Sequence, residues 1–508
     1  MNIKQAKEEI KHTVEAYLAK DEFGNYKIPA IRQRPVLLIG PPGVGKTQIM
    51  EQIARECGIG LVAYTITHHT RQSAVGLPFI KEENYGGRTY SVTEYTMSEI
   101  IASVYKKIEE TGRKEGILFI DEINCVSETL APTMLQFLQC KTFGNQAVPE
   151  GFIIVAAGNP PEYNKSVRDF DMVTLDRVRC MNVEADFTVW KEYAREKHIN
   201  HAILSYLELK PKNFYRVEAD VDGLQFVTAR GWEDLSNLMD VYEDLHFTVD
   251  EEVIHEFVRH EDVAEDVAAY FDLYKKYEDD YGISDILEGK VKSSVYARIY
   301  EAAFDERICV VNLLLSGLTN LFYGISKERK MTDQWYAFLK EYRKNLNEKE
   351  KKSSVFGQML KEKIAFDEQN EKNHFVSKED GNVIRLLNER LKETERYLAQ
   401  IETVNIEETQ LFTEAKKHFD RQCESLETLE NKGIEALEHA FSFMEHAFSN
   451  GQEMVVFVTG LTITPEIAVF VSEHPNASYE KYKNELLIGT KRAELLTQIK
   501  EDSLMNEK

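Results

Sequence analysis

Cysteine is scarce in this sequence, and its spacing excludes the common cysteine-based sites. The 508 residues contain six cysteines, none in a Cys-x-x-Cys pair and none grouped with histidine at zinc-binding spacing. We therefore interpret them as free thiols of a protein in a reducing compartment.

The sequence also lacks the signals of export and of membrane insertion. Its first residues, MNIKQAKEE, contain no apolar core of a signal peptide. We identify no run that approaches the ~18 uncharged apolar residues of a membrane helix. We therefore expect a soluble, cytoplasmic protein with no membrane insertion.

Positive charge is in deficit. The chain has 62 lysine and arginine residues against 86 aspartate and glutamate residues, a formal net charge of -24. An acidic chain binds nucleic acid poorly through its overall field, so the composition argues against nucleic acid as a partner. A local basic strip would not be visible in this total.

Four short apolar runs have the length and composition of buried strands. They cover residues 35–40, 61–67, 116–120 and 151–157, and helical patterns occupy 4–20 and 48–57. Strands separated by helical segments indicate a parallel sheet with crossover helices. We expect an α/β nucleotide-binding domain over residues 1–185.

The remainder is predicted to be mainly helical. Helical periodicity over 186–275, with a polar break at 210–222, predicts an all-α lid domain, and 276–508 is predicted to form a helical region for partner interaction. Within that region, 454–458 is a β-like run. Apolar residues at steps of three and four favour a long helical pair or a short coiled coil, at Ile384, Leu387, Leu391, Thr394, Leu398 and Ile401.

The loop after the first predicted strand fits the phosphate-binding pattern G-x-x-x-x-G-K-T. Its glycines let backbone N–H groups point at phosphate oxygens, and the following helix adds the positive end of its dipole. Lys46 would neutralise the β- and γ-phosphates, and Thr47 would ligate Mg²⁺. A chance glycine-rich turn is the competing interpretation, which the strand–loop–helix context disfavours. We predict that ATP is bound by Gly40, Pro41, Pro42, Gly43, Val44, Gly45, Lys46, Thr47 and Gln48.

A second motif follows the third predicted strand. The apolar run 117–120 ends in Asp121 and Glu122, which places two carboxylates at the sheet edge where ligands bind in α/β proteins. We predict that Asp121 holds Mg²⁺ and that Glu122 polarises the attacking water as general base. Alone, the two acids could be surface polarity, but together with the phosphate loop they favour hydrolysis.

With these two motifs the sequence resembles the AAA+ ATPases. Asn159, at the end of the fourth predicted strand, resembles the sensor residue that orients the water near the γ-phosphate, although an Asn-Pro turn is a competing interpretation. The segment 228–232, Thr-Ala-Arg-Gly-Trp, resembles the start of the lid helix that carries the second sensor. This resemblance implies that Thr228 caps that helix and that Arg230 points at the γ-phosphate.

The segment 173–179 resembles the one that carries the arginine finger in this family. Such an arginine reaches into the neighbouring subunit's site and stabilises charge on the transferring phosphoryl group. Arg177 and Arg179 are both candidates, and Arg168 is a weaker third. The family's usual Asp-Arg-Phe is Asp-Arg-Val here, and an ordinary salt bridge competes with the finger role for each arginine.

Within the AAA+ proteins the sequence is most similar to the MoxR branch, at residues 75–78, 159–164, 176–177 and 186–190. The resemblance covers about residues 4–275. The segment 81–92 departs from it, and 276–508 matches no family known to us.

The resemblance implies a homo-oligomer, a hexameric ring with ATP at the subunit interfaces, that acts as a chaperone-like remodeler of proteins. MoxR-type proteins commonly work with a von Willebrand factor A domain protein. No Asp-x-Ser-x-Ser string occurs here, so such a partner domain would lie on a separate chain. Two alternatives stay open: a nucleic-acid-associated motor and a nucleotide-gated assembly scaffold.

Overall fold

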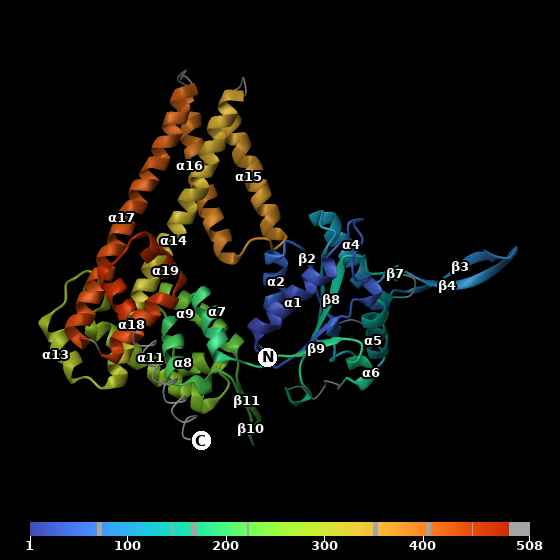
Figure 1. The fold of residues 1–508 in the computed structure, drawn as a ribbon, viewed down its shortest axis with the longest axis horizontal. Coiled ribbons are helices and arrows are strands. Elements are labelled where there is room, and N and C mark those ends of the chain that lie inside the picture. Colours follow the sequence, from blue (N-terminus) through green and yellow to red (C-terminus); the bar gives the residue numbers. More distant parts are fainter. Residues whose placement is uncertain are drawn as a thin grey trace, which may run out of the picture.

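The computed structural model describes residues 1–68, 74–143, 146–163, 170–220, 223–348, 354–402, 408–449 and 451–486. Figure 1 shows an α/β domain on one side of the molecule and a helical assembly on the other, from which a long helical arm projects. We call these parts the sheet domain, the lid with the C-terminal helices, and the arm.

The sheet domain is built on five parallel strands in the order β2-β5-β8-β1-β9. The four predicted strands are confirmed. The fifth, at the edge beside β1, was not predicted, because a four-residue strand with two polar residues carries little periodic signal. The strands are β1 (Val36–Ile39), β2 (Gly60–Thr65), β5 (Gly116–Asp121), β8 (Phe152–Gly158) and β9 (Arg179–Asn182).

Helices cover both faces of this sheet. Val36 and Leu38 pack with α1 (Ile3–Leu18) and α2 (Lys46–Glu56), while Leu37 faces the opposite way. The opposite face is covered by α4 (Glu99–Thr111) and α5 (Ala131–Cys140). Burial on both faces explains why the strands are uninterrupted apolar runs.

An antiparallel hairpin projects from the sheet domain (Figure 1), formed by β3 (Pro78–Tyr85) and β4 (Arg88–Tyr95). It includes the segment 81–92, to which the sequence analysis assigned no structure. Gly86 and Gly87 form its two-residue turn with φ of 64° and 82°, the left-handed geometry that tight hairpin turns require. A smaller hairpin joins β6 (Thr142–Phe143) to β7 (Gln146–Ala147).

The lid contains five helices and one hairpin. The hairpin, β10 (Arg216–Asp220) with β11 (Gly223–Val227), lies at the polar break of the sequence and adds two strands to a lid predicted to be all-α. The helices are α7 (Phe187–Glu196), α8 (His201–Leu209), α9 (Ala229–Asp244), α10 (Glu251–Phe257) and α11 (Glu261–Tyr281).

The C-terminal region is helical over its described residues. Parts of four of its helices share one core that forms the arm, with Leu387, Leu391 and Thr394 buried in it. The heptad-like residues therefore face a four-helix bundle. The helices are α12 (Ile283–Leu287), α13 (Ser293–Glu301), α14 (Phe304–Glu348), α15 (Ser354–Lys372), α16 (Lys378–Glu402), α17 (Glu408–Phe448), α18 (Gln452–Ile463) and α19 (Pro465–Glu473).

Two features of the C-terminal helices differ from the sequence analysis, which described residues 454–458 as β-like and identified no apolar run of membrane-helix length. The β-like run 454–458 lies inside helix α18, because periodicity alone does not distinguish a short buried strand from a buried helix segment. Helix α14 is long and apolar enough, between Phe304 and Leu346, to cross a bilayer, and 56% of its most apolar stretch is buried in the protein. The bent pair α18–α19 passes the same test only if taken as one span.

Candidate nucleotide-binding site

A cavity of about 300 Å³ lies between the phosphate loop and the lid. This volume is at the lower end of the range for small-molecule sites. Helices α1, α7 and α9 form its other walls, with the apolar side chains Ile3, Val189 and Trp190 among them. Of the predicted residues, the lining includes Pro42, Gly43, Val44, Gly45, Lys46, Thr47, Gln48, Asp121, Glu122, Asn159 and Arg230.

Lys46 is buried at the base of the phosphate loop. Its ammonium donates hydrogen bonds to the carbonyl oxygens of Gly40 (2.7 Å) and Pro41 (2.9 Å) and to Asn159 Oδ1 (2.9 Å). Burial lowers the pKa of Lys46 to about 8, against the opposing effect of Asp121. The loop thus holds a cation that gains stability when an anion enters the cavity.

The second motif brings oxygen ligands to the same point. The Thr47 hydroxyl donates a hydrogen bond to Asp121 Oδ2 (2.9 Å), and the Glu122 amide donates one to Asp121 Oδ1 (2.9 Å). The φ of Glu122 is 57°, in the left-handed region that a non-glycine residue enters only when its surroundings demand it. The strand end therefore turns sharply between the two carboxylates.

Asn124 is a site residue that the sequence analysis missed. Its Nδ2 donates a hydrogen bond to the backbone oxygen of Asn159 (2.8 Å), while its buried Oδ1 has no hydrogen-bond partner. A Cβ at Gly158 would lie 2.5 Å from that Oδ1, so the glycine makes room for this contact. The position of Asn124, three residues after Asp121 at the sheet edge, was the available signal.

The lid closes directly onto the phosphate loop. The Tyr215 hydroxyl donates a hydrogen bond to the Pro42 carbonyl (2.9 Å). A Cβ at Gly43, where φ is 76°, would lie 3.1 Å from Thr228 Cβ. The Thr228 hydroxyl accepts a hydrogen bond from the Gly231 amide (3.2 Å) as N-cap of α9, and Arg230 in the first turn lines the cavity.

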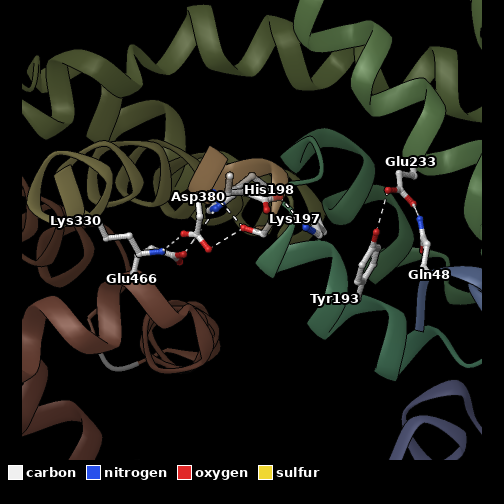
Figure 2. A network of polar contacts seen from close by, with 10 residues as sticks. Gln48, Tyr193, Lys197, His198, Glu233, Lys330, Asp380 and Glu466 are labelled. Carbon is white, nitrogen blue, oxygen red and sulfur yellow. Dashed lines mark hydrogen bonds and ion pairs between the residues drawn. The ribbon is translucent and has the colours of Figure 1, made fainter. Parts of the chain in front are cut away.

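A second lid contact joins α9, α7 and α2. Glu233 accepts hydrogen bonds from Gln48 Nε2 (3.3 Å) and from the Tyr193 hydroxyl (2.9 Å), as Figure 2 shows. All three residues line the cavity. Gln48 was predicted from its place beside Thr47, whereas Tyr193 and Glu233 were not, because the three segments meet only in the folded chain.

Arg177 and Arg179, two of the candidate finger arginines, are not among the residues that line the cavity. Arg179 begins β9, and its guanidinium bonds Glu9 Oε1 (2.5 Å) and Thr13 Oγ1 (2.6 Å) on α1. Arg177, after the short helix α6 (Met172–Leu175), is exposed and hydrogen bonds to Gln139. Arg168 lies outside the described residues.

Comparisons with known proteins fit this geometry. Residues 36–174 match the family "ATPase family associated with various cellular activities (AAA)". A human protein, ATPase family gene 2 protein homolog A, is 36% identical over 118 residues, which is 23% of this chain and 10% of the relative. The chain therefore spans about a tenth of that relative's length.

The crystal structure of a "putative ATPase" from Cytophaga hutchinsonii is 17% identical to this chain in sequence, with a TM-score of 0.21. The alignment covers 36% of this chain and 51% of that protein's chain. That TM-score is too low to support an argument. Residues 36–174 thus form an AAA ATPase family domain, a domain type that binds nucleotide, and the family match does not extend beyond them.

Proposed function

We propose that this protein binds and hydrolyses ATP in the cavity between the sheet domain and the lid. The observation that carries the proposal is the convergence of four side chains at one sheet edge. Lys46 contacts Asn159, and Thr47 contacts Asp121, through side chains 113 and 74 residues apart in sequence. A buried cation beside a hydroxyl–carboxylate pair suits a phosphate chain and its metal ion.

The residues present fit Mg²⁺. Hydroxyl and carboxylate oxygens are the hard ligands this ion prefers, and Thr47 Oγ1 and Asp121 Oδ2 lie 2.9 Å apart. These two side chains would hold the ion, which when bound neutralises charge on the phosphates. We assign binding of the phosphate chain to the backbone of residues 40–48 and to Lys46.

We assign the chemistry to Glu122, Asn159 and Arg230. Glu122, turned by its left-handed backbone, would accept a proton from the attacking water as general base. Asn159 would orient that water, and Arg230 would stabilise the γ-phosphate from the lid side. The lining of one cavity by all three side chains supports these roles.

We assign the finger to Arg177 rather than Arg179, acting on a neighbouring copy of the chain. Arg177 is exposed, whereas Arg179 is engaged by two side chains of α1. AAA family proteins are typically oligomeric, and we propose a hexameric ring. Arginines that stabilise phosphoryl-transfer charge from a neighbouring subunit can raise hydrolysis by ~10³–10⁵-fold.

For the cellular role we propose a MoxR-like, chaperone-like remodeler in the cytoplasm, with a von Willebrand factor A domain protein as partner on a separate chain. In this proposal the nucleotide-binding domain is formed by residues 1–185 and the lid by residues 186–275. Interaction with the partner is assigned to residues 276–508. The exposed hairpin and the long arm offer surfaces for protein contacts. The net charge of -24 disfavours the nucleic-acid motor.

The test is the Glu122→Gln variant, which keeps the shape of the side chain and removes the base. We expect hydrolysis to fall by ~10²–10⁴-fold, with nucleotide still bound at near wild-type affinity. Equal hydrolysis rates in the variant and the wild type would remove the enzyme proposal and leave the nucleotide-gated scaffold. Protein retained on DNA in a salt-dependent manner would favour the motor.

A further inference from the structure

The lid and the C-terminal helices share one hydrophobic core. The cluster that contains Trp232 of the lid also contains Leu314, Phe441 and Phe457 of α14, α17 and α18. A buried hydrogen bond from Asn312 Nδ2 to Ser205 Oγ (2.8 Å) joins α14 to the lid helix α8. Because a continuous core resists internal rearrangement, these parts should move as one body.

Helix α7 of the lid ends against three C-terminal helices. The ammonium of Lys197 forms an ion pair with Glu379 Oε1 of α16 (2.7 Å). The ring centroids of the neighbouring His198 and of Tyr323 on α14 lie 3.8 Å apart. His198 Nε2 also lies 3.7 Å from Glu466 Oε1 of α19. Figure 2 shows Lys197, His198 and Glu466 in one field with the Tyr193–Glu233–Gln48 contacts of the nucleotide cavity.

The nucleotide cavity therefore lies close to the base of the arm along α7. Tyr193, which lines the cavity, is four residues before Lys197, about one helical turn. Lys197 contacts the first turn of α16 through Glu379. In the same turn, Asp380 forms an ion pair with Lys330 of α14 (3.2 Å), which joins two helices of the arm.

The arm meets the sheet domain at a different and smaller contact. The guanidinium carbon of Arg113, after α4, lies 3.7 Å from the ring centroid of Phe375, in the turn between α15 and α16. Beside this contact is an open hollow of about 230 Å³, lined by Arg55 of α2 and by His374 of the turn. The contact is made by one short turn of the chain, and a contact of that extent can slide or separate at low cost.

We infer that the arm is a lever fixed to the lid, and that it swings relative to the sheet domain when nucleotide changes the angle of the lid. The turn that contains Phe375 is where the arm contacts the sheet domain, through Arg113. The inference rests on the proposed function in one respect, namely that nucleotide binds between sheet domain and lid. It assigns to the C-terminal half the task of converting nucleotide state into arm position.

The experiment measures two distances in the full-length chain, each between a pair of site-specifically incorporated spin labels. Glu109 on α4 and Lys392 on α16 report on the sheet domain and the arm, and Asp234 on α9 with Lys392 reports on the lid and the arm. All three positions are exposed. Each pair is measured without nucleotide, with Mg²⁺–ADP and with a non-hydrolysable ATP analogue and Mg²⁺, whose binding is measured independently.

The lever predicts a nucleotide-dependent shift of several ångströms between Glu109 and Lys392, and an unchanged distance between Asp234 and Lys392. Phe375→Ala should enlarge or broaden the first distribution without changing the second. Lys197→Glu should broaden the second, and the added exchange Glu379→Lys should restore it. Lys417→Ala, which removes an exposed ion pair with Glu414 on α17 of the arm, is the matched control and should leave both distributions as in the wild type.

The alternatives give distinct results. Equal nucleotide-dependent shifts in both distances would show that the arm moves independently of the lid and overturn the lever. So would a constant Glu109–Lys392 distance in protein that demonstrably binds nucleotide. Failure to bind either nucleotide would overturn the proposed function, and the lever with it.

Discussion

Lys46 shows at the scale of a single residue why the loop is more than a glycine-rich turn. Its ammonium is buried among three oxygen acceptors. Burial lowers its pKa to about 8. An entering phosphate would favour the charged form, so nucleotide binding and the protonation of Lys46 should be linked.

We predict that ATP binding takes up protons near pH 8. Below that pH Lys46 is already charged and affinity should change little, whereas above it Kd should rise, approaching about tenfold per pH unit. Calorimetry in buffers of different ionisation enthalpy measures the uptake directly. Lys46→Met should abolish it, and proton release by the wild type would contradict the assignment.

Asn124 provides a second prediction at this scale. Asn124→Leu keeps the volume but removes both the donor to the Asn159 backbone and the unpartnered Oδ1. We expect a small change in Tm, because removing the unpartnered Oδ1 offsets part of the cost of losing the donor to the Asn159 carbonyl. We also expect a fall in kcat of about tenfold with nearly unchanged nucleotide affinity. A loss confined to Tm would show that Asn124 is merely structural.

At the scale of elements, helices and strands with strong local sequence patterns could be predicted. Elements whose structure depends on contacts with distant parts of the chain could not. The apolar strands β1, β2, β5 and β8 and the helices α1 and α2 follow from apolar runs and spacing. Asp121 and Glu122 follow from the end of one such run. Strand β9 and the hairpin β10–β11 are short and polar, so pairing with neighbours decides their structure. The hairpin β3–β4 had a usable signal in Gly86-Gly87.

The short segment from α6 to β9 separates the two finger candidates. We predict that Arg179→Ala lowers the free energy of unfolding by about 1 kcal/mol, because the half-exposed ion pair with Glu9 and the bond to Thr13 are lost. Arg177→Ala should leave the unfolding free energy within ~0.5 kcal/mol of wild type but lower hydrolysis strongly. Chemical denaturation and steady-state hydrolysis measure the two effects, and the opposite pattern would transfer the finger to Arg179.

At the scale of the whole molecule, the sequence predicted an α/β domain followed by helices. It did not predict that the lid and the C-terminal helices share one core, because residues such as Trp232 and Phe441 meet only through tertiary packing. The apolar stretch of α14 also follows from this packing, since that helix lies against α17, α18 and α19. Its burial within the protein accounts for an apolar run long enough to resemble a membrane span.

The central claim is that the catalytic site is shared between copies of the chain, and a mixing experiment tests it most directly. Glu122→Gln and Arg177→Ala proteins should each bind ATP, assemble and hydrolyse it very slowly. Mixed at equal amounts and reassembled, about one interface in four should pair an intact Glu122 with a neighbour's intact Arg177, if exchange is random. We therefore predict recovery of about a quarter of wild-type hydrolysis. If both variants bind and co-assemble but no activity returns at any ratio, the site is not shared through Arg177.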